Sequence, residues 1–254
     1  MTIIEPTNES VKKLAGLHLY HGDISNCSMR VRMTLEEKEL NWVSHHIDLK
    51  KKENITDEYF GINPNGLVPT LIHDGVVHIE SNDIIDYLDT AFPDPSLRSA
   101  DKEAEMLEWL KLSADLHVPA IKPYVYAKKI APKIKKSQEE EAKYKDLQKN
   151  EELKEFHSKH AGQNTFSDDD IRRSEELLSD AFSRLEESLK DAPWILGDQF
   201  SLADISWIPI NFVLVGCGYD YSPYPNVMRW MASVQARESY RKGILNWCED
   251  FSKV

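Results

Sequence analysis

The stretch LVPTLIHDGVVHIES, residues 67–81, decides the fold of this chain. Two apolar runs flank the dipeptide Asp74-Gly75, which is typical of a two-residue β-hairpin turn. Ser81 ends the stretch, and the segment 83–92 that follows has the apolar spacing of a helix. The apolar positions of that segment are Ile84, Ile85, Leu88 and Phe92. The sequence therefore predicts two antiparallel strands followed by a helix.

Residues upstream of the hairpin predict a β-α-β unit. LHLYHGD (17–23) and NWVSHHIDL (41–49) alternate apolar and polar side chains, which is typical of strands. MRVRMTLEEKEL (29–40), between them, spaces apolar residues among charges as an amphipathic helix does. Strands joined through a helix are parallel, so we expect an α/β domain with a small mixed sheet in the order βαβ–ββα. A short helical piece is expected around EYFGINP (58–64).

The second half of the chain predicts helices only. Pro93 and Pro95 should end the third helix and open a linker at 94–100. Beyond the linker, helical spacing occurs at 103–126 (with bends at Pro119 and Pro123), 168–189, 201–215, 225–236 and 238–248. The charge-dense segment 128–169 should be a solvated, partly helical insert. We therefore expect an N-terminal extension at 1–15, an α/β domain at 16–93, the linker, and an all-helical domain at 101–254.

Composition excludes several classes of function. The net charge of −12, from 43 acidic and 31 basic residues, should repel nucleic acid and anionic membranes. No apolar run approaches the roughly 20 residues that span a bilayer. The beginning, MTIIEPTNESVKKL, lacks the pattern of a secretory signal. The three cysteines form no CxxC pair or Cys/His cluster, so we expect no metal site and a cytoplasmic location.

FSLADI, residues 200–205, carries the clearest local signal of the helical half. Ser201 and Asp204 have the spacing of a capping box, with aspartate in place of the usual glutamate or glutamine. Phe200 and Ile205 stand where a hydrophobic staple would lie. We expect a structural role, with a cap worth roughly 1 kcal/mol.

Several motifs in the right order carry a family resemblance. They are NGLVPTL (65–71), IES (79–81), a proline-containing linker and SLADI (201–205). Together with the βαβ–ββα pattern, they resemble the cytosolic glutathione transferases over nearly all of residues 16–248. The resemblance implies a thioredoxin-like, glutathione-binding domain, a helical substrate domain, glutathione as co-substrate without a metal, and a homodimer. SNCSMRVRM (25–33) resembles the opening of the zeta class and of the tetrachlorohydroquinone reductive dehalogenases.

The resemblance also implies how glutathione is held. Val68 precedes a proline that is cis in the family and turns the backbone of Val68 towards the cysteinyl backbone of glutathione; an ordinary edge-strand Pro69 is the alternative. Glu80 and Ser81 open a helix whose N–H groups suit the γ-glutamyl carboxylate, although Ser81 could simply cap that helix. Glu80 supplies an acceptor for the nearby amino group of glutathione. One lysine of the run Lys50-Lys51-Lys52, with Lys52 as the candidate, could reach the glycyl carboxylate; a solvated loop is the alternative.

The serines of SNCSMRVRM (25–33) suit the stabilisation of a glutathione thiolate. Free glutathione is mostly protonated at neutral pH, and lowering the pKa of its thiol by about 1.5 units needs roughly 2 kcal/mol. A hydroxyl hydrogen bond to the thiolate contributes roughly 1.5–3 kcal/mol, and a helix N-terminus about 0.3–1 kcal/mol. Ser25 can therefore stabilise the thiolate without a general base. Ser28 lies closer to the predicted helix and is a candidate for its cap.

Cys27 suits another chemistry. A thiol near a helix N-terminus can itself be the nucleophile. It could attack a glutathionyl conjugate and form a mixed disulfide, which a second glutathione would resolve. This is the route of a reductive dehalogenase, a thioltransferase or a glutathionyl lyase, and an inert buried cysteine is the alternative.

The small hydrophobic electrophile should bind between the opening loop and the first helix of the second domain. Candidates to line this pocket are Trp109, Ser113, His117, Tyr124 and Tyr126, although aromatic residues at helical spacing are usually core. The leading hypothesis is a glutathione transferase acting by conjugation, substitution or isomerisation. A non-catalytic interaction module with the same fold is the alternative of another class.

Overall fold

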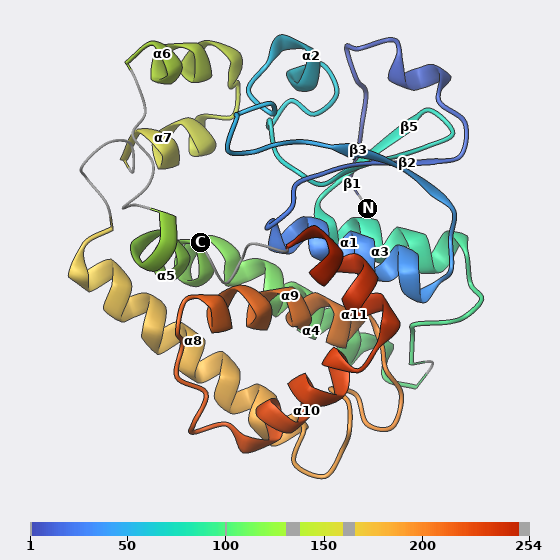
Figure 1. The fold of residues 1–254 in the computed structure, drawn as a ribbon, viewed down its shortest axis with the longest axis vertical. Coiled ribbons are helices and arrows are strands. Elements are labelled where there is room, and N and C mark those ends of the chain that lie inside the picture. The colour runs from blue at the N-terminus through green and yellow to red at the C-terminus, as the bar shows by residue number, and fades with distance from the viewer. Residues whose placement is uncertain (1, 100, 131–137, 160–165, 249–254) are drawn as a thin grey trace.

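The N-terminal half folds around a five-stranded mixed sheet with the strand order β1-β5-β4-β2-β3. The computed structural model describes residues 2–99, 101–130, 138–159 and 166–248 (Figure 1). The strands are β1 (Thr2–Ile4), β2 (Leu17–His21), β3 (Trp42–His46), β4 (Thr70–His73) and β5 (Val76–Ile79). Strands β2 and β3 are parallel and β4 and β5 are antiparallel, which confirms the predicted mixed sheet.

Strand β1 was not expected. It lies in the segment assigned to an N-terminal extension and pairs antiparallel with β5, Thr2 facing Ile79. A short 3₁₀ turn, η1 (Val11–Lys13), follows it, and Val11 is buried beneath the sheet. Three residues are too few for a periodic signal, so only the pairing partner identifies this strand.

The predicted hairpin forms at its predicted turn. Asp74 and Gly75 have φ angles of +49° and +81°, the left-handed values that a tight two-residue turn demands. A side chain could not replace the hydrogen of Gly75, because a Cβ there would lie 2.4 Å from the carbonyl oxygen of Lys12. The turn is thus fixed both by conformation and by close approach of the backbone.

Three helices complete the N-terminal half: α1 (Asn26–Glu37), α2 (Asp57–Phe60) and α3 (Ser81–Ala91). Helices α1 and α3 lie side by side between the sheet and the second half of the chain (Figure 1). The described part of the second half is largely helical, as predicted. Its helices are α4 (Glu103–Asp115), α5 (Lys122–Val125), α6 (Gln138–Leu147), α7 (Glu151–Lys159), α8 (Asp168–Ser188), α9 (Leu202–Gly216), α10 (Pro225–Gln235) and α11 (Glu238–Gly243).

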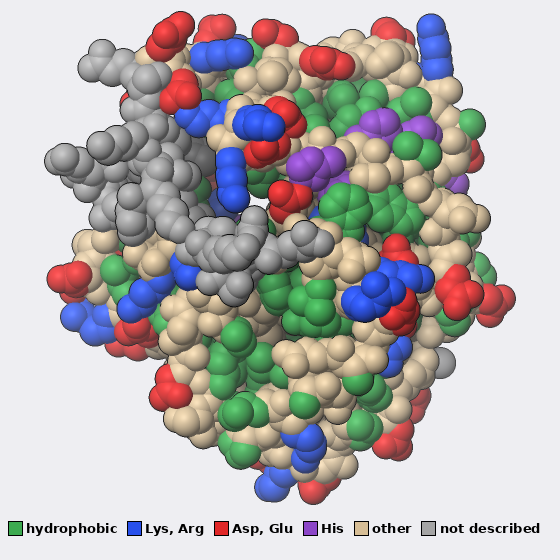
Figure 2. All heavy atoms as spheres, viewed as in Figure 1, with side chains coloured by type: hydrophobic (Ala, Val, Ile, Leu, Met, Phe, Trp, Pro, Cys, Tyr) green, Lys and Arg blue, Asp and Glu red, His purple; other side chains and the backbone are tan. Residues whose placement is uncertain are grey.

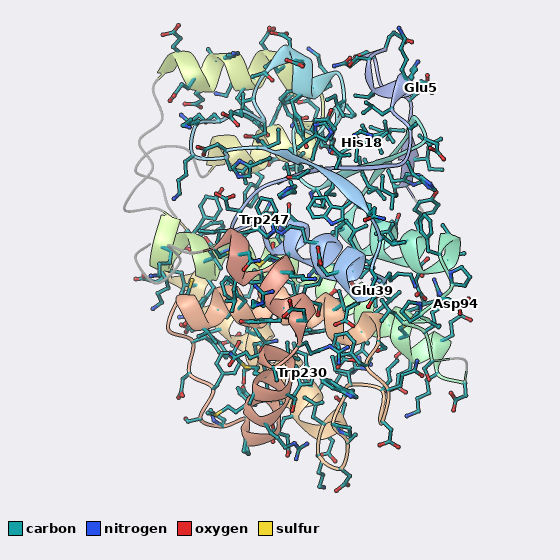
Figure 3. The ribbon with its side chains drawn as sticks, turned by 45° about the vertical axis from the view of Figure 1, so that its right-hand side comes forward. Glu5, His18, Glu39, Asp94, Trp230 and Trp247 are labelled. Carbon is teal, nitrogen blue, oxygen red and sulfur yellow. The ribbon has the colours of Figure 1, made fainter. Side chains whose placement is uncertain are left out.

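The expected interruption after α4 takes the form of π-helical turns. They are η2 (His117–Ile121), which contains Pro119, and η3 (Tyr126–Ile130), which follows the short helix α5. A final 3₁₀ turn, η4 (Leu245–Trp247), brings Trp247 to the junction of the two halves (Figure 3). The predicted capping box is present as well, since Asp204 Oδ2 accepts both the N–H and the hydroxyl of Ser201.

Helix α1 connects the two halves through two buried arginines. Arg30 Nε donates to the carbonyl oxygen of Ser206 in α9 at 2.9 Å, and Arg32 Nε to that of Gly243 in α11 at 2.7 Å. Both arginines are at most 2% exposed. The larger of two hydrophobic clusters among the described residues runs from the sheet through α1 into the helical half. The N-terminus of α1 is therefore held in a fixed position at the interface.

The charged insert contributes α6 and α7, which lie beside α2 (Figure 1). Its partly helical character agrees with the prediction, but its contacts were not foreseen. Gln148 is fully buried and donates from Nε2 to the carbonyl oxygen of Asn65 at 2.9 Å. Glu140 forms an ion pair with Lys52. The described part of the insert therefore packs against the N-terminal half. Within the described ranges, none of the helices is long and apolar enough to cross a membrane.

Candidate active site

Ser25 begins helix α1 as its N-cap residue. Its backbone is extended, with φ −83° and ψ 112°, and its Oγ accepts the N–H of Ser28 at 3.2 Å. This corrects the expectation that Ser28 caps the helix: Ser28 is fully buried, and its Oγ accepts the N–H of Gly22. The capping bond uses a lone pair of the Ser25 hydroxyl and leaves its proton to donate. Ser25 is half-buried and can therefore cap the helix and meet a ligand at once.

Helix α3 supplies a second N-terminus. Glu80 precedes it with φ +66°, and Ser81 is its first residue and is buried. Desolvation, followed by the nearby charge of Asp83, raises the pKa of Glu80, while Lys122 opposes the shift. The Ser81 hydroxyl accepts a hydrogen bond from Arg30 Nη1 at 3.1 Å. The O–H of Ser81 therefore remains available to donate a hydrogen bond to an anion.

The Val68-Pro69 peptide bond is cis, as the family resemblance implied. Pro69 is buried directly before β4, and Val68 is half-buried. Among the described residues, no hydrogen bond uses the N–H or C=O of Val68. A backbone N–H and C=O that are partly buried need hydrogen-bond partners, and an extended peptide can supply an acceptor and a donor for them.

Cys27 lies one residue inside α1, half-buried, with its Sγ 3.9 Å from Arg30 Nη1. Arg30 was not singled out as a site residue from the sequence. Its Nη2 is buried and has no hydrogen-bond partner among the described residues. A buried guanidinium donor without a partner is costly. The arrangement therefore suits an incoming acceptor.

Lys122 is a second cation near Cys27 and Glu80. Burial lowers the pKa of Lys122, while the charges of Cys27 and Glu80 oppose the shift. Its Nζ lies 4.5 Å from the ring centre of Phe156 in α7. Burial, followed by the charges of Lys122 and Arg30, lowers the pKa of His117 to about 3, so the imidazole is neutral. Lys122 was also missed, because a lysine next to a proline in a predicted helix carries no signal by itself.

The predicted pocket residues fall into two groups. The first group lies near the proposed site: burial lowers the pKa of His117, and so do the charges of Lys122 and Arg30, which are close to it. Ser113 is buried and accepts a hydrogen bond at 3.0 Å from Nδ2 of Asn82, the residue that follows Ser81. The aromatic candidates pack in the helical half. Trp109 meets Trp207 edge-on at 5.7 Å, Tyr124 meets Tyr219 at 5.6 Å, and Tyr126 meets Phe166 at 6.0 Å.

Lys52 forms an ion pair with Glu140. Its Nζ lies 2.5 Å from Glu140 Oε1 of the insert, and both side chains are partly exposed. No local sequence signal pairs Lys52 with Glu140, because the two residues are far apart in the chain. A ligand carboxylate at Lys52 would have to compete with this ion pair.

Family comparisons agree with the geometry. A sequence profile described as "Glutathione S-transferase, N-terminal domain" matches residues 19–96, and one described as "Glutathione S-transferase, C-terminal domain" matches residues 167–238. Together they cover more than half of the chain. The chain belongs to the glutathione transferase family. The predicted family and the predicted two-part fold are thereby confirmed, and the protein is an enzyme of the glutathione transferase type.

Individual relatives of this glutathione transferase cover most of its length. Protein LigF of Sphingobium sp. is 30% identical over 240 residues, which is 89% of this chain and 92% of LigF. Glutathione S-transferase TCHQD of Arabidopsis thaliana is 26% identical, over 90% and 89% of the two chains. Maleylacetoacetate isomerase of Mus musculus is 25% identical, over 88% and 89%. These relatives support the zeta-like and dehalogenase-like resemblance of the opening motif.

Two solved structures superimpose on most of this chain. The crystal structure of β-etherase LigF from Sphingobium sp. superimposes with a TM-score of 0.78 at 28% identity, covering 89% of this glutathione transferase and 98% of LigF. The epsilon-class glutathione S-transferase of the housefly, Musca domestica, superimposes with a TM-score of 0.71 at 21% identity, covering 93% and 95%. Glutathione as substrate fits this family.

Proposed function

We propose that the protein binds glutathione between the N-termini of α1 and α3 and activates its thiol with the Ser25 hydroxyl. The observation that carries this proposal is the N-cap geometry of Ser25, whose oxygen accepts the N–H of Ser28 and whose proton remains available. The γ-glutamyl carboxylate would meet Ser81, and the backbone of Val68 would pair with the cysteinyl unit. Lys52 would meet the glycyl carboxylate once it leaves Glu140.

The energetic requirement is modest. A hydrogen bond to a charged acceptor contributes roughly 1.5–3 kcal/mol, and a helix N-terminus adds about 0.3–1 kcal/mol. Each pKa unit corresponds to about 1.4 kcal/mol. One hydroxyl and one helix end are therefore enough to lower the pKa of the bound thiol by more than one unit. No metal or general base is needed for this step.

The reaction that we propose is substitution, in which the glutathione sulfur attacks carbon and a leaving group departs with the bonding electrons. An ether oxygen is the leaving group we favour, because a relative at 30% identity bears the name LigF and a β-etherase structure of that name superimposes closely. The electrophile would approach from the helical half, past His117 and Ser113. In this arrangement, residues 16–93 bind glutathione and residues 101–254 receive the substrate.

A β-aryl ether with a 4-nitrophenoxide leaving group tests the proposal. We expect glutathione-dependent release of 4-nitrophenolate by the wild-type protein and a decrease in kcat/KM of tenfold or more in Ser25→Ala. Cys27→Ala should retain most of this activity. Full activity of Ser25→Ala would contradict the assignment of Ser25, and full loss in Cys27→Ala would transfer the role to the cysteine.

Cys27 carries a second candidate function, favoured by the 3.9 Å approach of its Sγ to the Arg30 guanidinium. Its thiolate would attack the sulfur of a glutathionyl conjugate, and the C–S electrons would leave with carbon, which takes a proton from water. The resulting Cys27–glutathione disulfide would be reduced by a second glutathione, releasing glutathione disulfide. Loss of conjugate reduction in Cys27→Ser, with ether cleavage intact, is the expected result if both activities are present.

We also propose a homodimer in the cytoplasm. The family is commonly dimeric, and the three cysteines, Cys27, Cys217 and Cys248, are all free thiols, as in a reducing compartment. Light scattering at micromolar concentration should give twice the chain mass of 29.3 kDa. A monomeric mass would exclude the dimer and would leave the catalytic proposal unaffected.

A further inference from the structure

Lys122 places a positive charge beside the proposed thiol site. It is the first residue of α5 and is half-buried, so it reaches this site from the helical half of the chain. Burial lowers the pKa of Lys122, and the charges of Cys27, two residues after Ser25, and of Glu80, directly before α3, oppose the shift. The ammonium thus lies on the side from which the electrophile would approach.

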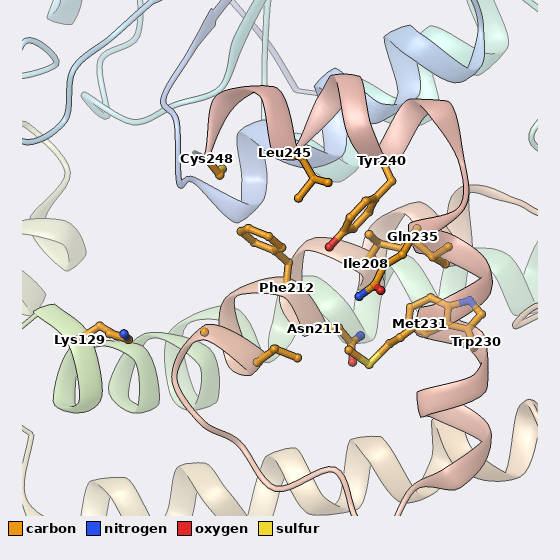
Figure 4. A pocket seen from close by; sticks show the side chains of 13 residues that line it. Lys129, Ile208, Asn211, Phe212, Trp230, Met231, Gln235, Tyr240, Leu245 and Cys248 are labelled. Atoms are coloured by element: carbon orange, nitrogen blue, oxygen red, sulfur yellow. The ribbon is translucent and has the colours of Figure 1, made fainter. Parts of the chain in front are cut away.

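The two lysines that follow on this stretch of chain face another region. Burial raises the pKa of Cys217, the C-cap of α9, and the charges of Lys129 and Lys128 oppose that shift. Lys129 also lines a cavity of about 500 Å³ between α9, α10 and α11, which Lys122 does not line (Figure 4). Of these three lysines, Lys122 is therefore the one that lies beside Cys27.

The ammonium of Lys122 has no carboxylate partner among the described residues. In this acidic chain, basic and acidic side chains are interspersed on the face shown in Figure 2, and an exposed lysine such as Lys111 pairs with Asp115. Lys122 Nζ forms neither an ion pair nor a hydrogen bond with a described residue, and it lies instead 4.5 Å from the centre of the Phe156 ring. A half-buried ammonium without an acceptor is costly, so the site favours an anion that a ligand supplies.

Lys122 is also the group of this cluster that can release a proton. A guanidinium such as that of Arg30 stays protonated. Burial, followed by the charges of Lys122 and Arg30, lowers the pKa of His117 to about 3, so this imidazole is already neutral at pH 7. Glu80 would face the amino group of glutathione in the proposed binding mode. Because burial lowers the pKa of Lys122, its ammonium is a stronger acid than that of a lysine in water.

The proposed substitution creates a need for such an acid. As the carbon–oxygen bond breaks, negative charge moves from the glutathione sulfur to the leaving oxygen, which lies on the far side of the carbon. Ser25 would stabilise charge on the sulfur alone. An unsubstituted phenoxide is a strong base, since a phenol has a pKa of about 10, like the tyrosine side chain. It leaves readily only when a cation or a proton meets its developing charge.

We propose that Lys122 is the acid catalyst of ether cleavage and makes unactivated aryl ethers substrates. The electron pair of the thiolate forms the S–C bond, and the C–O pair leaves on oxygen. While that bond breaks, Lys122 Nζ gives the oxygen a proton, and it later regains one from water. The products are the glutathione thioether and a neutral phenol. The Phe156 ring, which lies beside Nζ, positions the ammonium. This inference rests on the proposed function and adds a catalytic residue to it.

Two β-aryl ethers with the same carbon skeleton test this role, one with a 4-nitrophenoxide and one with a phenoxide leaving group. Nitrophenoxide is a weak base and needs little help to leave. In Lys122→Met, we expect kcat/KM to fall about a hundredfold or more for the phenyl ether, as after the loss of a general acid, and about threefold or less for the nitrophenyl ether. Equal losses with both ethers would overturn the role of Lys122. If the wild-type protein cleaves neither ether with glutathione, the proposed reaction itself is wrong, and this inference falls with it.

Glutathione affinity and a neighbouring lysine supply the controls. Lys122→Met should bind glutathione with the wild-type dissociation constant in calorimetric titration, because the ammonium acts on the leaving group. An affinity weaker by about tenfold would make Lys122 a ligand of glutathione and refute the assignment. Lys128, further along the same stretch, is exposed, and its Nζ lies 5.7 Å from the centre of the Tyr124 ring. Lys128→Met should leave kcat/KM for both ethers unchanged, and a loss equal to that of Lys122→Met would also contradict the proposal.

Discussion

The guanidinium of Arg30 donates a buried hydrogen bond of 3.1 Å from Nη1 to the Oγ of Ser81. The bond joins the second turn of α1 to the first residue of α3, and 51 positions separate the two residues. The two helix N-termini that form the proposed glutathione site are thus tied together by one side chain. Since Arg30 Nε also binds Ser206 in α9, the same side chain fixes the helical half to this site.

Arg30→Lys should weaken glutathione binding. A lysine keeps the charge but cannot reach Ser81 and Ser206 together, since it lacks the planar fork of donors. Loss of one charge-assisted hydrogen bond is worth roughly 1.5–3 kcal/mol, so we expect the dissociation constant of glutathione to rise about tenfold or more. Calorimetric titration measures this effect directly.

Arg32→Lys is the matched control for that experiment. Arg32 is equally buried on the same helix, but it binds the carbonyl oxygens of Gly22, Asp23 and Gly243 and not Ser81. Both variants should lower the melting temperature, while only Arg30→Lys should alter glutathione affinity. Equal losses of affinity would mean that Arg30 acts through general stability alone.

Ser25→Ala should shift the pH dependence of catalysis upwards. Without its hydroxyl, the bound thiol loses a hydrogen bond worth roughly 1.5–3 kcal/mol, so the pKa seen in kcat/KM should rise by about one to two units. Helix α1 also loses its cap, at a cost of about 1 kcal/mol in the free energy of unfolding. Ser25→Thr should retain the wild-type profile. The profile is measured between pH 5.5 and pH 9.

Ser28→Ala tests whether the second serine at the N-terminus of α1 affects stability alone or also the pKa of the bound thiol. Ser28 is fully buried and accepts the N–H of Gly22, so its loss should destabilise the protein and leave the pH profile unchanged. A shifted profile in Ser28→Ala with an unshifted one in Ser25→Ala would reverse our assignment of the two serines.

Glu140→Gln should strengthen glutathione binding slightly. The Lys52–Glu140 pair is partly exposed, and such pairs contribute about 0–1 kcal/mol. Freeing Lys52 for the glycyl carboxylate should therefore lower the KM for glutathione by no more than about fivefold. The effect should shrink at 1 M salt, where the screening length falls to about 3 Å. Glu139→Gln, at the neighbouring exposed position, is the control and should change nothing.

His78 should make the protein less stable in acid. Burial, followed by the charge of His73, lowers the pKa of His78 to about 4 from an ordinary value of 6.5. The unfolded chain therefore binds the proton first, so the stability contributed by neutral His78 is complete above pH 6.5 and is lost as the pH falls towards 4. Neither ring nitrogen has a hydrogen-bond partner among the described residues, and the ring stacks on Tyr87 at 4.0 Å.

His78→Phe tests this effect because it retains the stacking and removes the titration. We expect the free energy of unfolding of the variant to depend less steeply on pH between 4 and 6.5, by up to about 1.4 kcal/mol per pH unit. Urea denaturation at several pH values measures the slope. Desolvation raises the pKa of the buried Asp204 to about 6, so protonation of Asp204 favours the folded state as the pH falls, opposite to the effect of His78. Asp204 is present in both the wild-type protein and the His78→Phe variant, so it does not affect the comparison. Parallel curves for the two proteins would contradict the prediction.

The local features of this protein were predictable because short-range rules determine them. The Asp74-Gly75 turn needs left-handed backbone at two consecutive residues, and the capping box of Ser201 and Asp204 needs only a spacing of three. Helical and strand periods likewise depend on neighbours in the chain. The βαβ–ββα half, the helical half and the family could therefore be read directly from the sequence.

The details of the site depended on contacts between distant segments. Arg30 gained its role from Ser81 and Ser206, which are 51 and 176 residues away, and Lys52 was paired by the insert. Ser25 rather than Ser28 became the cap because the packing of α1 buries Ser28 against the backbone of Gly22. The sequence by itself determined the longer helices and strands, the fold class and the class of chemistry, since these follow from local propensity and periodicity, whereas the short strand β1 depended on its pairing with β5. The tertiary structure alone decided which polar groups are buried together, because burial is a property of the packed chain.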